Sequence, residues 1–462
     1  MAPSFRLVPT VAFAAAAGGL GWGIRGQFGH ETGAMVPGLL VSLVLVLLAA
    51  PRATSLRAAR AVALATVAFS FGGSMTYGQT IGLTQDAPLV GNWSAFAWGM
   101  LGLALKGALW IGFGGLFLGM GLGGRRYRPL EVGLLLGAMI AALLVGVALL
   151  NEPFEPAARQ LPAIYFSDHW AWEPGADLVP RRERWGGLLA ALLVGVSYVA
   201  AVKKDRLARD LALAGSLAGG LGFSLGQCVQ AWDAWNPEWI GLSVLAPLAP
   251  YVNWWKAMEV TFGLVLGGGL GLALWLRRDL VRDDEPPDVV SVGVGSEVAL
   301  LVVHVAALVA WNFGAFRPLD AVAEHAIPMG LIPMVAVLGG RYWPYLLALP
   351  VTALPIAGKT LRNISYREPL VPEAWGWVLL VVLPLAATTT LAVWLARRGR
   401  RDQDGRAFTR TTLLASVALY LALSFAELEF PGPWAVPTEG TLIAVVFGVL
   451  GVALAGLALR RY

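Results

Sequence analysis

The feature that most constrains this chain is a series of long apolar runs separated by short polar connections. Each run has about 17–25 residues, the length at which an α-helix crosses the hydrocarbon core of a bilayer. Arg341 separates the runs 326–340 and 343–358, and these two runs could instead form one kinked helix. We predict about fourteen spans in total, with a range of about 12 to 14. They cover residues 7–24, 34–50, 61–83, 94–122, 129–150, 186–202, 209–230, 255–276, 292–313, 326–340, 343–358, 374–396, 411–428 and 440–459.

The runs predict helices rather than strands. Inside a bilayer every backbone group must be hydrogen-bonded within a helix or a closed barrel. Barrel strands would alternate polar and apolar residues over about 10 positions, whereas these runs are longer and uniformly apolar. Of the 462 residues, 57% are hydrophobic and 14% are charged, and soluble domains carry about 25% charged residues. We therefore predict an all-α, multi-pass integral membrane protein.

Basic residues predict the orientation, because Lys and Arg are enriched in cytoplasmic loops. If the N-terminus is cytoplasmic, the connections on the inner side are rich in Arg and Lys, whereas most outer connections carry acidic residues. The outer loops 151–185 and 359–373 are exceptions with several basic residues. The pattern predicts that both termini are cytoplasmic. We expect the protein to lie in the inner membrane of a bacterium. The inner basic residues are Arg52, Arg57, Arg60, Arg125, Arg126, Arg128, Lys203, Lys204, Arg206, Arg209, Arg277, Arg278, Arg282, Arg341, Arg397, Arg398, Arg400, Arg401, Arg460 and Arg461.

The chain contains no evident soluble domain. We predict a first membrane half at 1–202, a second at 203–400 and a C-terminal helix pair at 401–462, with about six helices in each half. Residues 277–288, rich in charge and proline, are the best candidate for a linker. The longest loop, 151–185, contains Trp, Pro and Gly residues and is expected to form an ordered cap on the outer face.

A glycine-rich motif recurs at the end of three outward-running spans. GGLGWGIRGQ at Gly18–Gln27 and GGLGFSLGQ at Gly219–Gln227 share both glycine pairs, a leucine, an aromatic position and the closing Gly-Gln. FGGSMTYGQ at Phe71–Gln79 is a looser copy. Such internal similarity predicts repeated structural units, here repeated parallel helical hairpins. Coincidence in a sequence rich in glycine and leucine is the alternative explanation.

The helices that return after each motif are also alike. Residues 32–40, 106–126 and 256–278 each begin with a polar residue that small and apolar residues follow, and the last two end in an Arg pair. Matching residues of symmetric hairpins would surround one axis. Nine polar residues are therefore expected to converge in the outer half of the bundle as a solute site. They are Arg25, Gln27, His30, Glu31, Gln79, Lys106, Gln227, Lys256 and Glu259.

Lys106 and Glu259 lie inside predicted spans, where an unpaired charge is costly, so each should have a counter-ion or water. Lys256 and Glu259 are three residues apart on one helical face and could simply pair with each other. Arg25, Lys106 and Lys256 together suit an anionic or phosphate-bearing solute, although they could equally balance Glu31 and Glu259.

Other candidates are weaker. His304 lies within a predicted span and could relay protons or simply pack. Asp168 and His169, in the predicted cap, could act as acid and base. The single cysteine, Cys228, excludes an intrachain disulfide and a cysteine-rich metal site. No phosphate-binding, zinc-protease or serine-hydrolase motif is present, so we expect no cofactor and no metal.

Three functions fit these observations. The first is a transporter or channel-like carrier that moves a small polar or anionic solute along a path lined by the Gly-Gln helix ends. The second is a membrane transferase with a lipid-linked donor, which would use an acidic residue of the first outer loop, where His30 and Glu31 lie. The third is a non-catalytic subunit of a membrane complex. The expected partners are the solute and membrane lipids, with a homo-oligomer possible and no nucleic acid.

Overall fold

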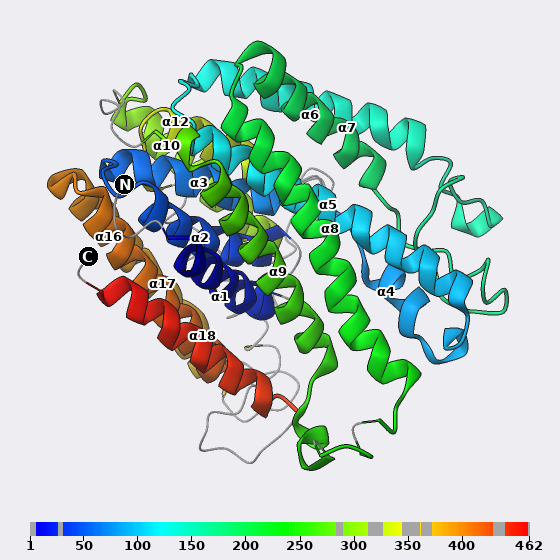
Figure 1. The fold of residues 1–462 in the computed structure, drawn as a ribbon. Helices are drawn as coiled ribbons and strands as arrows, with labels where there is room; N and C mark the ends of the chain where they lie inside the picture. The colour runs from blue at the N-terminus through cyan, green and yellow to red at the C-terminus, as the bar shows by residue number, and fades with distance from the viewer. Residues whose placement is uncertain are drawn as a thin grey trace.

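The computed structural model describes residues 6–25, 31–239, 241–244, 246–282, 290–312, 327–343, 361, 372–427 and 439–460, and these form helices joined by loops (Figure 1). The α-helices are α1 (Leu7–Arg25), α2 (Glu31–Ala49), α3 (Ser55–Gly72), α4 (Gly78–Gln85), α5 (Trp93–Leu122), α6 (Pro129–Leu150), α7 (Trp185–Ser197), α8 (Arg206–Trp235), α9 (Trp254–Leu276), α10 (Val294–Asn312), α12 (Ile327–Leu338), α15 (Glu373–Gly376), α16 (Leu383–Asp402), α17 (Gly405–Glu427) and α18 (Thr441–Leu459). Two π-helical segments continue them, η3 (Tyr198–Val202) after α7 and η7 (Trp377–Val382) before α16. Short 3₁₀ turns are η1 (Ala87–Leu89), η2 (Pro156–Ala158), η4 (Ala246–Tyr251) and η5 (Arg278–Leu280).

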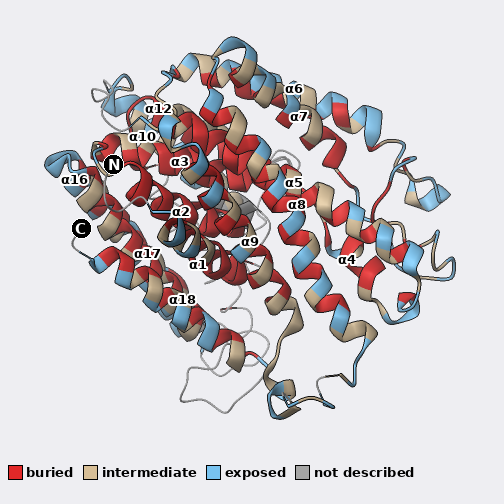
Figure 2. Ribbon diagram, viewed as in Figure 1, coloured by how far each residue is buried: buried red, intermediate tan, exposed pale blue. Residues whose placement is uncertain are grey.

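Six helices form a closed ring at the centre of the molecule. Going round it, α1 packs on α2, α2 on α3, α3 on α5, α5 on α8, α8 on α9, and α9 returns to α1. Neighbouring helices run in opposite directions. In Figure 2 the buried residues are concentrated in this ring, and exposed residues are frequent on the outer helices.

Glycines bring the ring helices into very close contact. Gly18 of α1 lies against the backbone of Gly263 of α9, and Gly219 of α8 lies against Gly107 of α5. At each of these four positions an added Cβ would overlap a carbonyl oxygen of the facing helix. Small residues permit such close approach of membrane helices.

The remaining helices lie outside the ring. The α6–α7 pair packs mainly on itself, with α6 also on α12 and α7 on α5, along one side of the molecule (Figure 1). Beside this pair α12 packs on α3 and α6. On the other side α17 packs on α2 and α3, and α18 packs on α1.

The predicted helical membrane class is confirmed. Eight described helices, counting α7–η3 and α15–η7–α16 as one each, are long and apolar enough to cross a membrane, so the protein is membrane-embedded. The count of fourteen spans stays a prediction, because other described helices are shorter or more polar, and 344–360 lies outside the described residues. The division into halves at 202 and 400 also stays a prediction.

One predicted span, 61–83, has a different structure. Here α3 begins earlier, at Ser55, because the Thr54 side chain accepts a hydrogen bond from the Arg57 N–H (3.3 Å) and caps the helix. It ends at Gly72, and α4 begins at Gly78. The break, residues 73–77, reads GSMTY and contains glycine, serine and threonine.

The loops divide between two ends of the bundle. At one end, here called the basic end, Arg125 donates to the Lys204 carbonyl (3.5 Å), Arg282 N–H to the Leu122 carbonyl (3.0 Å) and the Ser55 hydroxyl to the Gly399 carbonyl (2.6 Å). These contacts join loops that the sequence assigns to the inner side. The opposite end carries α4 and residues 151–184, which we call the cap.

Candidate functional site

The interior of the ring is filled by aromatic side chains from several helices. Trp22 of α1 lies 4.9 Å from Trp110 of α5 and 4.3 Å from Phe262 of α9, measured between ring centroids. Phe262 stacks on Phe223 of α8 at 4.7 Å, and Phe223 is 5.1 Å from Tyr77, in the break between α3 and α4. Because α1 and α5 are not neighbours in the ring, the Trp22–Trp110 contact crosses its interior. We call these five residues the aromatic cluster.

Arg25 lies within the aromatic cluster at the end of α1. Its guanidinium carbon is 4.8 Å from the ring centroids of both Trp22 and Trp110 and 5.4 Å from that of Tyr77. It also donates a hydrogen bond to the Tyr77 hydroxyl (2.9 Å). The residue is only 1% exposed. Cation–π attraction is strongest at such desolvated sites, where it reaches about 2 kcal/mol.

Lys256 and Glu259 form an ion pair on the buried face of α9, with Nζ 2.7 Å from Oε2. Lys256 also donates to the Gly23 carbonyl of α1 (3.2 Å), and the Trp255 indole donates to Glu259 (3.2 Å). The pairing expected from their spacing is therefore present. Gly23 lies two residues before Arg25 on α1, so this pair and Arg25 belong to one polar region inside the ring, here called the central site.

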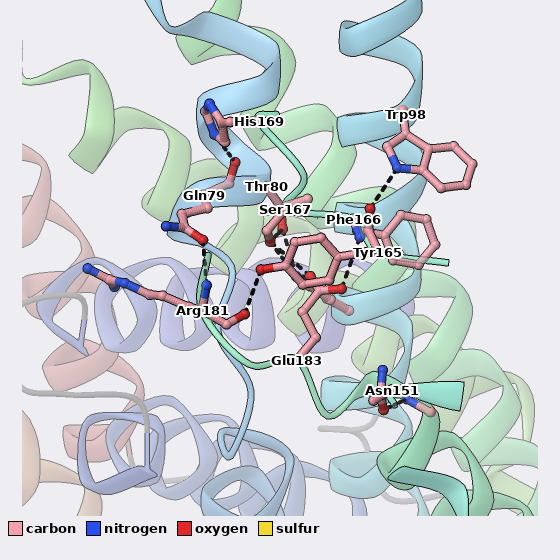
Figure 3. Close-up of polar contacts among 12 residues, drawn as sticks. Gln79, Thr80, Trp98, Asn151, Tyr165, Phe166, Ser167, His169, Arg181 and Glu183 are labelled. Atoms are coloured by element: carbon pink, nitrogen blue, oxygen red, sulfur yellow. Dashed lines mark hydrogen bonds and ion pairs between the residues drawn. The ribbon is translucent and has the colours of Figure 1, made fainter. Parts of the chain in front are cut away.

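Lys106 occupies a separate polar network, and Figure 3 shows its partners Thr80, Ser167 and Glu183. Its ammonium lies 2.5 Å from the carboxylate of Glu183, which comes from the cap, and donates to the Thr80 hydroxyl (2.6 Å). The second oxygen of Glu183 accepts from the Phe166 N–H (2.9 Å), and the Ser167 hydroxyl donates to the first (2.8 Å). The expectation that Lys106 has a counter-ion is confirmed. Because its partner Glu183 belongs to the cap, Lys106 holds the cap against the helix bundle.

Gln79 is a second anchor of the cap. Its side chain donates to the Val179 carbonyl (2.8 Å) and accepts from the Arg181 N–H (3.0 Å), while its own carbonyl contacts Nε2 of His169 (2.9 Å). Nearby, Tyr165 donates to the Arg181 carbonyl (2.7 Å), and burial raises the pKa of this tyrosine, which keeps it protonated. The predicted ordered cap is thus observed, and Gln79 binds it.

The other predicted residues divide into two groups. Gln227, fully buried, donates to the Thr84 hydroxyl of α4 (2.8 Å). Gln27 and His30 lie outside the described residues, as does the side chain of Glu31, whose backbone begins α2. Of the nine candidates, Arg25, Lys256 and Glu259 come together at the central site, whereas Gln79, Lys106 and Gln227 contact α4 or the cap.

The remaining candidates have local contacts. Asp168 accepts from the Ala171 N–H (3.0 Å), and His169 Nδ1 is 4.0 Å from the Asp86 carboxylate. His304 is buried, with its ring 6.0 Å from that of Trp343. Within the described part of the chain, no three His, Cys, Asp or Glu side chains are grouped so that they could hold a metal ion.

Sequence reasoning missed several residues of these sites. Trp22 and Phe223 occupy the aromatic position that the two glycine motifs share, so that position was a usable signal. Glu183 was hidden, because it stands between Arg182 and Arg184 in a loop, and nothing in its spacing points to Lys106.

Comparison with known proteins gives no assignment. No family model, no curated protein and no solved structure matches this chain.

Proposed function

We propose that the protein is a membrane transporter for a small polar or anionic solute. The observation that carries this proposal is the central site, where Arg25, Lys256 and Glu259 are almost completely buried inside a closed ring of helices. Charged side chains within membrane bundles are costly and mark solute or ion pathways. A purely structural subunit would not need them.

The break between α3 and α4 supports this role. Tyr77 lies in the break and accepts the hydrogen bond from Arg25. Transporters commonly form their solute sites at discontinuous helices, whose freed backbone groups become ligands. Rearrangement of residues 73–77 would move the Tyr77 ring and change the surroundings of Arg25.

The glycine contacts support a repeated hairpin. Within the pairs α1–α2, α3–α5 and α8–α9, the close contacts are Gly21 to Pro37, Gly72 to Trp110 and Gly222 to Phe262. In each outward-running helix, the residue three positions before this contact touches the preceding hairpin of the ring. These earlier contacts are Gly18 to Gly263, Phe69 to Gly38 and Gly219 to Gly107.

We infer three hairpins related by a pseudo-threefold axis normal to the membrane. The repeated spacing makes coincidence a poor explanation for the three sequence motifs. Repeats around a shared site are typical of transporters, in which one unit moves against the others. This arrangement modifies the two-half organisation expected from the sequence.

The described charges favour an anionic solute. Arg25 and Lys256 contribute two positive charges to the central site, and Glu259 contributes one negative charge. A guanidinium can bind a carboxylate or phosphate through two parallel hydrogen bonds. The aromatic cluster fills the space beside Arg25, so the rings of Trp22 and Trp110 must separate before a solute enters. This conformation corresponds to a closed state.

The orientation belongs to the same proposal. The basic end would face the cytoplasm, as the loop charges predict, and the cap would face the opposite side. A bacterial inner membrane is the compartment that we propose.

Thermal-shift measurements on the purified protein test the solute class. We would titrate inorganic phosphate, succinate, nucleotides and sucrose, because a ligand that binds the folded state raises the unfolding temperature with concentration. An anion that stabilises the wild type should lose most of its effect in Arg25→Lys, which keeps the charge but not the planar donor pair. Arg159→Ala, in the exposed cap, is the control. Stabilisation by anions that is equal in Arg25→Lys and wild type would refute the central site.

Uptake into liposomes then tests transport itself. The anion found by thermal shift should accumulate in vesicles that contain the wild type and much less in those with Arg25→Lys. Binding without uptake in correctly reconstituted protein would contradict a transporter.

A further inference from the structure

A groove runs between α6 and α7–η3 on the outside of the molecule, at the basic end. Its volume is about 740 Å³. Its walls are apolar and include Leu134, Ala138 and Val194. Leu130 and Leu134 are 75% and 67% exposed. Because both helices are long and apolar enough to span a membrane, these walls lie where lipid chains would be.

The end of the groove is positively charged. Arg126, Arg128 and Lys203 line it together with Glu131 and Tyr198. Lys203 pairs with Glu131 at 2.7 Å, and the Tyr198 hydroxyl also donates to Glu131. The acidic group is thereby neutralised, while no ion pair between described residues involves the side chain of Arg126 or Arg128.

The basic end of the groove is held in a fixed arrangement. Lys203 donates to the Arg126 carbonyl (2.8 Å) and lies 4.9 Å from the centroid of the Tyr127 ring. Tyr127 in turn donates to Asp205 (2.9 Å), which caps α8 by accepting from the Ala208 N–H (3.1 Å). The loop that carries both arginines is therefore attached to the start of α8, and their backbones are positioned before any ligand binds.

We propose that this groove binds an anionic phospholipid. Its phosphate would lie between Arg126 and Arg128, and one acyl chain would lie along Leu130, Leu134 and Ala138. A soluble anion would use the arginines but leave the apolar walls uncovered, and a zwitterionic lipid would leave the excess positive charge unbalanced. The match of an anionic head to a basic rim and of a chain to an apolar groove selects the lipid. The proposal does not depend on the transported solute.

Native mass spectrometry of the detergent-purified protein tests this inference, with phosphatidylglycerol and phosphatidylcholine of identical acyl chains. We expect the wild type to bind phosphatidylglycerol more tightly. Arg126→Gln/Arg128→Gln should weaken that binding about 30-fold, roughly fivefold per charge, and leave phosphatidylcholine unaffected. Arg159→Gln/Arg182→Gln, in the cap at the opposite end, is the charge-matched control and should change neither lipid.

A second pair of variants tests the acyl-chain position. Ala138→Trp would fill the groove and should reduce binding of phosphatidylglycerol, whereas Leu144→Trp, exposed on α6 but outside the groove, should not. All four positions in the test variants are exposed or on the groove surface, and equal unfolding temperatures would verify folding. Equal affinity of the wild type for both lipids would overturn the proposal. The proposal would also be overturned if Ala138→Trp bound phosphatidylglycerol as tightly as the wild type and inorganic phosphate competed for the site. Those results would indicate an ion site without a lipid chain.

Discussion

The ammonium of Lys106 lies 2.5 Å from the carboxylate of Glu183, and the two side chains are 1% and 0% exposed. The two residues come from different kinds of structure, since Lys106 is in the middle of α5 and Glu183 is near the end of the cap. The described hydrogen bonds of the Lys106 ammonium are all with α4 or the cap. The pair therefore fastens the cap to the helix bundle, whereas the sequence suggested a solute ligand.

Removing one partner of this pair should be strongly destabilising. Lys106→Met leaves Glu183 buried without a counter-charge, and such a change costs about 3–5 kcal/mol. We expect a large decrease in the thermal unfolding temperature in detergent. The double variant Lys106→Met/Glu183→Gln removes both charges and should recover much of the loss. If Lys106→Met were as stable as the wild type but inactive in uptake, Lys106 would instead belong to the solute path.

The close approach of α5 and α8 should not tolerate a methyl group. Gly219→Ala would place a Cβ against the Gly107 carbonyl, and relieving such overpacking costs about 1–3 kcal/mol. Gly448→Ala in α18 is a matched control, because no atom lies within 4 Å of the added Cβ. Thermal unfolding of both variants measures the difference. Equal unfolding temperatures would mean that the two helices are farther apart.

Gln79 should control how often the cap opens. Gln79→Ala removes two hydrogen bonds to the cap, each worth about 0.5–1.5 kcal/mol, so the open state should become about 5- to 150-fold more populated. Arg181 and Arg182 are exposed sites for trypsin, and cleavage after them should accelerate accordingly. Gln160→Ala, within the cap but away from Gln79, serves as control. An unchanged cleavage rate in Gln79→Ala would show that the cap does not depend on this residue.

Asp205 should make stability depend on pH. Burial raises the pKa of this carboxyl above its ordinary value, so the folded protein binds the proton more tightly than the unfolded chain. The resulting stabilisation is complete below the ordinary pKa and is lost as the pH rises through the raised pKa.

Asp205→Asn isolates this effect, because asparagine also caps helices but does not titrate. The unfolding temperature of the wild type, relative to Asp205→Asn, should decrease as the pH rises above the ordinary carboxyl pKa of about 4. The opposite slope would show that neighbouring cations such as Arg125 lower the pKa instead.

The helical class and the positions of most helices could be predicted, because the length of an apolar run is set by the bilayer. The break at residues 73–77 was not predicted, although it contains the weak helix formers Gly73, Ser74 and Thr76, because glycine, serine and threonine are also common inside membrane helices. Thr54 is a recognisable helix cap, and it could have placed the start of α3.

The sites were less predictable than the helices. Spacing alone indicated the Lys256–Glu259 pair, because both residues lie on one helix. The partner of Lys106 comes from a distant loop, and no local pattern specifies such a pairing. The glycine motifs located Arg25 correctly inside the bundle, but their closing glutamines at 79 and 227 contact the cap and α4 because the aromatic cluster fills the interior.

The contact between Gly18 and Gly263 joins two helices that are synthesised at different times. A ribosome adds about 5–20 residues per second, so α1 is made roughly 10–50 s before α9. During that interval the glycine face of α1 has no permanent neighbour, although α2, α3 and α5 are already present. The ring closes only when α9 packs between α8 and α1. A chain terminated before α9 would therefore have a gap between α1 and α8.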